Sequence, residues 1–224
     1  FARQGVELSR ALLSNWVDAC CQLMTPLNDA LYSYVMNTRK VHTDDTPVKV
    51  LAPGRKKAKT GYIWTYVRDD RNAGSPEPPA VWFAYSPDHQ GKHPEQHLRP
   101  FRGILQADAF AGYDRLFSAE REGGALTEAG CWAHARRKIH DVYISSISAA
   151  AEEGLKRISE LYAIENEIRG LPESERLAVR QRRSKSLLAS LHEWMEEKNA
   201  TLSKKSRLGE AFSYVQNQWD ALCY

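Results

Sequence analysis

Three runs of β-branched and aromatic residues, joined by short polar turns, constrain the fold of this chain more than any other feature. They lie at 41–51, 62–67 and 81–85, and the turn between the last two is rich in Gly, Pro and Ser. Runs of this composition with short connections predict an antiparallel β-meander. A fourth apolar run, at 104–107, follows a short helix signal at 93–102 and is predicted to be a buried strand.

Helical patterns flank these runs on both sides. Residues 4–37 carry apolar side chains at helical spacing with an interruption at Pro26, and we expect a helical hairpin packed on the main domain. After the fourth strand we predict a short helix at 113–122, a fifth strand at 129–133 and a helix through Arg136. From about residue 145 the pattern is helical and highly charged to the end.

The order of these elements resembles that of a ribonuclease-H-like domain. That α/β fold has a mixed five-stranded sheet with flanking helices, and its first and fourth strands lie side by side at the centre. Asp44, in the His42–Pro47 motif, falls on the first strand, and Asp108 at the end of the fourth, 64 positions later (108 minus 44). Each follows an apolar run, and we expect the two carboxylates to meet in space.

Two carboxylates on adjacent strands can bind magnesium, which prefers oxygen ligands and assists phosphoryl transfer. Each aspartate alone has an ordinary alternative, Asp44 as a strand-end cap and Asp108 as a helix N-cap, because an unpaired charge is costly to bury. Their coincidence on neighbouring strands favours the metal site. Asp45 alternates with Asp44 and is expected to point to the opposite face of the sheet.

The bulk composition adds few constraints. The formal net charge of the 224 residues is only +3, and basic residues gather in four short runs that are more often solvated faces than binding sites. Cys131 and His134 lie three positions apart without a second such pair, which disfavours a zinc site and favours a buried Cys131 on the fifth strand. His134 is expected either to contact a phosphate or to cover a helix surface.

The four cysteines show neither a disulfide framework nor zinc-ligand spacing, and the chain carries no signal peptide or long apolar stretch. These features predict a reduced, cytosolic chain without a membrane partner. The chain begins with Phe1 and stops at Tyr224 without a clear terminating signal. We therefore expect it to be a piece of a longer protein.

Several motifs together resemble the insertion-sequence-66 family of bacterial transposases. They are Gly5–Arg10 and Leu13–Val17 in the first helical segment, His42–Val50 and Gln106–Tyr113 around the two acids, Cys131–Lys138, and Leu161–Glu165. Asp45 stands where that family usually has Glu, which leaves Asp44 as the matching catalytic acid.

The resemblance implies a D-D-E DNA transposase in which Asp44 and Asp108 are catalytic and bind Mg²⁺ or Mn²⁺. It also implies transposon ends and target DNA as partners, a homo-oligomer in the active complex and a bacterial cytoplasmic location. The expected phosphate contacts are basic residues near these motifs: Arg55, Lys56, Lys57, Arg136 and Arg137.

The third acid of that family lies in an Asn-Asn-x-x-Glu motif, and the chain contains no Asn-Asn pair. We therefore expect a central fragment, inactive or nearly so, whose two-metal site is complete only in the intact protein. Its segments are an amino-terminal helical segment (1–38), an incomplete catalytic core (39–144) and a helical insertion (145–224).

Two alternatives remain open. The first is a nuclease of the same fold with Glu165 as its third acid. The second is a non-enzymatic DNA-binding or assembly module that uses the helices of 145–224 for contacts.

Overall fold

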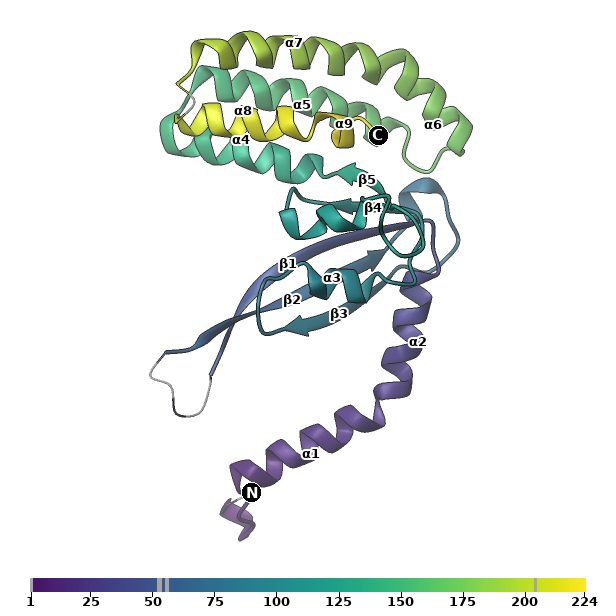
Figure 1. Ribbon diagram of the computed structural model, residues 1–224, viewed down its shortest axis with the longest axis vertical. Coiled ribbons are helices and arrows are strands. Elements are labelled where there is room, and N and C mark those ends of the chain that lie inside the picture. The colour runs from purple at the N-terminus through teal and green to yellow at the C-terminus, as the bar shows by residue number, and fades with distance from the viewer. Residues whose placement is uncertain (1, 52–53, 55–56, 204) are drawn as a thin grey trace.

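The computed structural model describes residues 2–51, 54, 57–203 and 205–224, and its centre is a five-stranded mixed sheet (Figure 1). The strand order is β3-β2-β1-β4-β5. The meander strands pair antiparallel, whereas β1 pairs parallel with β4 and β4 parallel with β5. The predicted meander and the predicted pairing of the first and fourth strands are confirmed. The strands are β1 (Lys40–Val50), β2 (Lys59–Arg68), β3 (Ala80–Ser86), β4 (Ile104–Ala107) and β5 (Thr127–Gly130).

Helices occupy both ends of the chain and most of its second half. Two expectations need correction: the fifth strand starts earlier than position 129, and the helix expected at 113–122 is a 3-10 turn at Ala111–Leu116. The helices are α1 (Arg10–Leu23), α2 (Thr25–Met36), α3 (Lys92–His97), α4 (Trp132–Ser146), α5 (Ala149–Glu167), α6 (Glu173–Val179), α7 (Lys185–Thr201), α8 (Arg207–Asn217) and α9 (Trp219–Leu222). A π-helical turn at Arg180–Ser184 joins α6 to α7.

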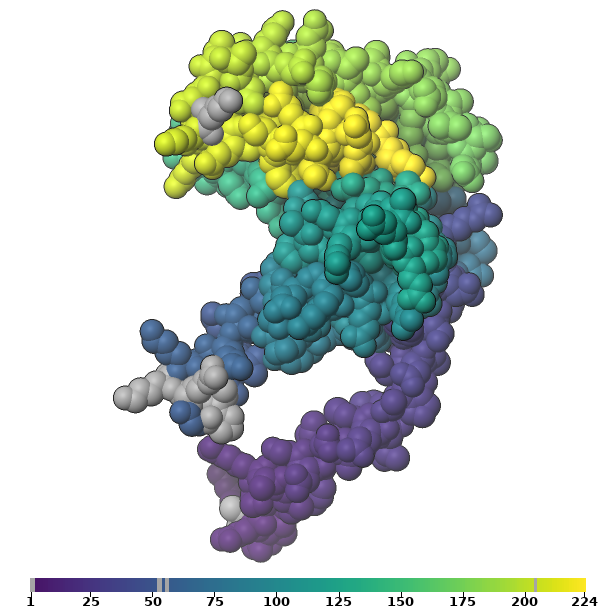
Figure 2. All heavy atoms as spheres, viewed as in Figure 1, coloured from purple at the N-terminus to yellow at the C-terminus, as the bar shows by residue number. Residues whose placement is uncertain are grey.

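The amino-terminal segment is not the packed hairpin that we expected. The break near Pro26 is confirmed, since α2 begins with that proline in its first turn. However, a single residue, Met24, ends α1 and precedes α2, which is shorter than the usual two- to five-residue loop of a helical hairpin. The described side chains of α1 include no buried one, and the helix reaches away from the body of the molecule (Figure 2). Of these two helices, α2 packs on the sheet, through Val35 and Met36.

The buried apolar side chains form two separate hydrophobic cores. One lies on a single face of the sheet, where Val41, Trp64, Tyr66 and Leu105 pack beneath α2, α3 and the 3-10 turn. The other fills the helical layer formed by α4, α5, α7 and α8. The buried side chains of α4 belong to this second core, although we grouped residues up to 144 with the sheet. The helical layer therefore starts directly after β5 and stands over the β4–β5 end of the sheet (Figure 1).

Helix lengths also bear on membrane contact. Among the described residues, no helix is long and apolar enough to cross a lipid bilayer.

Candidate active site

The parallel pairing of β1 with β4 brings the two acid motifs together. The last registered pair is His42 with Gln106, and each aspartate lies two residues further along its own chain segment. This register puts Asp44 and Asp108 at the same level of the sheet. Asp44 lies within the first strand, as expected, and is not the strand-end cap of the ordinary alternative, because β1 continues to Val50 on its pairing with β2. The pairing of β1 with β4 ends near this level, whereas its pairing with β2 continues. Asp44 therefore lies on a part of β1 that β4 does not cover.

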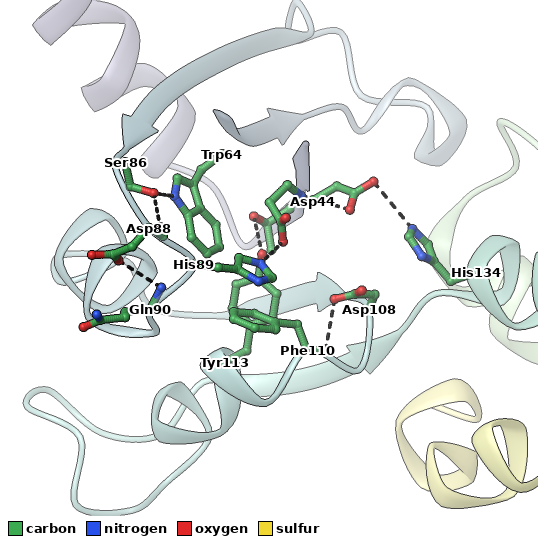
Figure 3. A network of polar contacts seen from close by, with 12 residues as sticks. Asp44, Trp64, Ser86, Asp88, His89, Gln90, Asp108, Phe110, Tyr113 and His134 are labelled. Carbon is green, nitrogen blue, oxygen red and sulfur yellow. Dashed lines mark hydrogen bonds and ion pairs between the residues drawn. The ribbon is translucent and has the colours of Figure 1, made fainter. Parts of the chain in front are cut away.

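Both carboxylates are held by backbone amides close to them in the chain. The Oδ1 atom of Asp44 accepts a hydrogen bond of 3.0 Å from the N–H of Asp45. The Oδ1 atom of Asp108 accepts one of 3.1 Å from the N–H of Phe110. Asp108 thus caps the turn after β4 and is not the helix N-cap considered from the sequence, because the N-cap residue of the 3-10 turn is Phe110. The second oxygen of Asp44 is directed toward His134 of α4 (Figure 3).

The groove between the sheet and the helical layer has a volume of about 810 Å³. The acids form its wall on the sheet side. The opposite wall comes from the helical layer, with His134, Arg137 and Lys138 of α4 beside Tyr214 of α8. The groove is therefore acidic on one side and basic on the other, an arrangement that suits a phosphate chain with metal ions bound to it.

His134 reaches Asp44 from the first turn of α4. Its Nε2 atom lies 3.6 Å from Oδ2 of Asp44, and its side chain is 20% exposed, so it stands at the groove and not on an outer helix surface. Cys131, expected to be buried on the fifth strand, instead follows β5 as the N-cap residue of α4 and is half-buried. This part of the prediction is wrong because β5 ends at Gly130.

A tyrosine connects the helical layer to the loop that carries Asp108. The hydroxyl of Tyr214 accepts a hydrogen bond of 3.4 Å from the N–H of Ala109, and Nζ of Lys138 lies 4.7 Å above its ring. Burial raises the pKa of the Tyr214 hydroxyl, while the Ala109 hydrogen bond acts in the opposite direction. The net effect is a pKa above the ordinary value of tyrosine. These contacts fix α8 beside the second acid.

Asp45 contributes to a different contact. Its Oδ1 atom lies 2.9 Å from Nε2 of His89, in the loop after β3. Thr43, on the same face of β1, contacts the hydroxyl of Tyr113 in the sheet core. Alternation along the strand therefore directs Asp45 toward the core side and Asp44 away from it, as predicted. The sequence had not indicated His89, because nothing in its local pattern shows which strand it will face.

The predicted basic contacts are only partly described. Arg55 and Lys56 lie outside the described residues, and Lys57 is exposed in the β1–β2 turn. Arg137 lines the groove, and together with Arg136 and His140 it also lines a second hollow of about 600 Å³ between α4 and α5. Within the part of the chain that the structure describes, neither arginine forms an ion pair. Their charges are thus available to an external anion.

Glu165 does not join the two aspartates. Its carboxylate accepts two hydrogen bonds from the guanidinium of Arg180, of 2.7 and 2.6 Å, within the helical layer. It is not among the residues that line the groove. Across the described ranges, no three side chains of His, Cys, Asp or Glu converge as a metal-binding group.

Comparisons with known proteins agree with the motifs. A family model described as "Transposase IS66 family" matches residues 1–224. The uncharacterized proteins y4hP, y4qI and y4jD of Sinorhizobium fredii are 38%, 35% and 33% identical to this chain. The matches cover 98%, 99% and 99% of the chain but only 42%, 42% and 44% of those proteins. The chain therefore spans less than half the length of these relatives.

Proposed function

Because the chain belongs to the IS66 family of transposases, we propose that it is the central part of a D-D-E DNA transposase. The whole protein would act in the bacterial cytoplasm, cleave DNA strands at transposon ends and join them to target DNA. The observation that carries this proposal is the β1–β4 register, which sets Asp44 level with Asp108 opposite a basic wall. We also infer that the sheet is ribonuclease-H-like, an inference that the order β3-β2-β1-β4-β5 and its strand directions support.

The two aspartates offer ligand atoms of the type that magnesium and manganese prefer. Both acids offer hard carboxylate oxygens, and Mg²⁺ commonly binds one or two protein carboxylates and takes its other ligands from water and substrate phosphates. Bound there, the metal would activate a water or a 3′ hydroxyl and stabilise the leaving oxygen of an in-line displacement. Asp44 suits the role of a metal ligand because its side chain is 54% exposed toward the groove.

The chain's own residues would bind and orient the DNA. Arg137 and Lys138 face the acids across the groove and would hold phosphates of the cleaved strand. Arg136 and His140, in the hollow between α4 and α5, would contact the flanking backbone. Lys57, with Arg55 and Lys56, would contact DNA at the β1–β2 turn. Tyr214 would keep the Asp108 loop against α8.

We propose that this chain alone is inactive or nearly so, because its third acid is missing. The test is strand transfer by the chain on transposon-end DNA with Mg²⁺ or Mn²⁺. We expect no product. Strand transfer by the chain, lost in Asp44→Ala, would overturn the inactivity. Magnesium-dependent cleavage lost in Glu165→Gln would instead favour the nuclease.

The second candidate is a DNA-binding and assembly module, and the exposed α1 supports it. Trp16, Val17 and Leu23 are 51%, 63% and 81% exposed, which is unusual for such apolar side chains on a helix outside an assembly. A homo-oligomer is proposed on the same ground. DNA binding that is unchanged by Mg²⁺ and by the double variant Asp44→Ala/Asp108→Ala would favour the module over the transposase core.

A further inference from the structure

A three-ring stack joins β2 and the loop after β3 to the second acid motif. The imidazole of His89 lies between Tyr62 of β2 and Phe110 of the loop after β4, with ring centroids 4.2 and 3.9 Å away. The interplanar angles of 7° and 15° make both contacts parallel stacks. Figure 3 shows the ring of His89 next to that of Phe110, to one side of Asp44 and Asp108. His89 therefore touches the second acid motif through a ring.

The same histidine touches the first acid motif through a hydrogen bond. Its Nε2 atom lies 2.9 Å from Oδ1 of Asp45, and a carboxylate oxygen accepts, so the ring nitrogen donates. The backbone amides of its two partners hold the carboxylates, since Asp45 N–H donates to Asp44 and Phe110 N–H donates to Asp108. One side chain thus contacts both residues whose amides orient the acids.

The loop around His89 is fitted closely to the Asp108 loop. A Cβ at Gly91 would lie 2.5 Å from the carbonyl oxygen of Gly112, and a Cβ at Gly112 would overlap the ring of Phe110. A glycine at position 91 allows the two backbones to approach so closely, and a glycine at 112 leaves room for the Phe110 ring.

The loop is also braced on both sides of the histidine. Ser86 Oγ accepts from the Trp64 indole and donates to the carbonyl of Asp88, and the carboxylate of Asp88 accepts from the N–H of Gln90. These hydrogen bonds hold the backbone on both sides of His89 and so fix the position of its ring (Figure 3).

We propose that His89 is a positioning residue that sets the separation of Asp44 and Asp108 by clamping Asp45 and Phe110. This rests on the proposed function, because a metal site tolerates only about 0.5 Å of misplacement in its ligands. The clamp has two arms, the hydrogen bond to Asp45 and the stack on Phe110. Losing either arm frees one acid motif to move relative to the other.

Two substitutions separate the arms. His89→Phe keeps an aromatic ring between Tyr62 and Phe110 but removes the donor, whereas His89→Gln keeps a donor and removes the ring. Asp45→Ala removes the hydrogen bond without touching the stack, and it serves if a change at His89 prevents folding. His93→Gln is the matched control. His93, in α3, donates a hydrogen bond of 2.7 Å to Asp88 of the His89 loop but does not line the groove.

The readout is Mn²⁺ binding by this chain, followed as paramagnetic broadening of the amide signals of Asp45 and Phe110. We call the Mn²⁺ concentration that gives half of the full broadening the midpoint. In His89→Phe, His89→Gln and Asp45→Ala we expect this midpoint to rise roughly 10- to 100-fold, the usual cost of losing a residue that orients metal ligands. His93→Gln should keep the wild-type midpoint. The double variant His89→Phe/Asp45→Ala should be no weaker than either single one, since both remove the same arm.

Wild-type midpoints in all three clamp variants would overturn the proposal, as would an equal rise in His93→Gln. If the wild-type chain shows no broadening that depends on Asp44 and Asp108, the proposed metal site fails, and hydrogen exchange of the Phe110 amide then decides the clamp. Exchange that is faster in His89→Gln and unchanged in His93→Gln supports it. Exchange unchanged in both overturns it.

Discussion

Removing the basic wall of the groove should change how DNA binding depends on salt. Arg137 and Lys138 face the acids from α4, and we assign one phosphate to each. Each phosphate neutralised on duplex DNA contributes about 0.9 to the slope of log affinity against log salt concentration. The double variant Arg137→Ala/Lys138→Ala should therefore lower the magnitude of that slope by about 1.8. At 0.1 M salt, this counterion term corresponds to roughly 60-fold weaker binding.

The assay is fluorescence anisotropy of a labelled duplex with this chain at several salt concentrations. Arg182→Ala/Lys185→Ala is a charge-matched control in the helical layer, because neither residue lines the groove. It should leave the slope unchanged. An equal loss of slope in both double variants would refute the assignment, since it would show that binding depends on net charge and not on the groove. An unchanged slope in Arg137→Ala/Lys138→Ala would refute it as well.

Other predictions concern the acids, the packing and the pH response. Asp108→Asn should abolish Mn²⁺-dependent broadening of the Phe110 amide, whereas Glu165→Gln, whose carboxylate pairs with Arg180, should leave it unchanged. Gly112→Ala should lower the free energy of unfolding in urea by about 1–3 kcal/mol, because its methyl group would overlap the Phe110 ring, and exposed Ala111→Ser should not. Burial lowers the pKa of His97 to about 4 from an ordinary value of 6.5. The unfolded chain therefore binds the proton more readily, and the urea midpoint should fall as pH drops from 6.5 to 4, with a weaker dependence in His97→Gln.

The sheet was predictable because its signals are local. β-branched runs with short turns specify a meander, and the resemblance to the ribonuclease-H-like order implied that the run at 104–107 lies beside the first strand. That order was enough to bring Asp44 near Asp108. It gave the extent of β1 closely, but it could not show that residues 46–50 pair with β2 alone.

The contacts that complete the site were not predictable for a physical reason. Asp45 and His89 lie 44 positions apart, and Ala109 and Tyr214 lie 105 apart. Neither pair leaves a periodic signal, since each depends on how loops and the helical layer dock. The exposed α1 was missed for a related reason. Its apolar spacing favours burial, but the one-residue joint at Met24 directs the helix away from the sheet.

The central claim is that Asp44 and Asp108 are the catalytic carboxylates of a transposase. It is tested most directly by strand transfer on transposon-end DNA with the intact transposase that contains this chain. We predict that Asp44→Ala and Asp108→Ala each abolish cleavage and joining while DNA binding persists, and that Asp141→Ala, an exposed aspartate of α4 outside the groove, retains activity. Strand transfer at the wild-type rate by either of the first two variants would contradict the account.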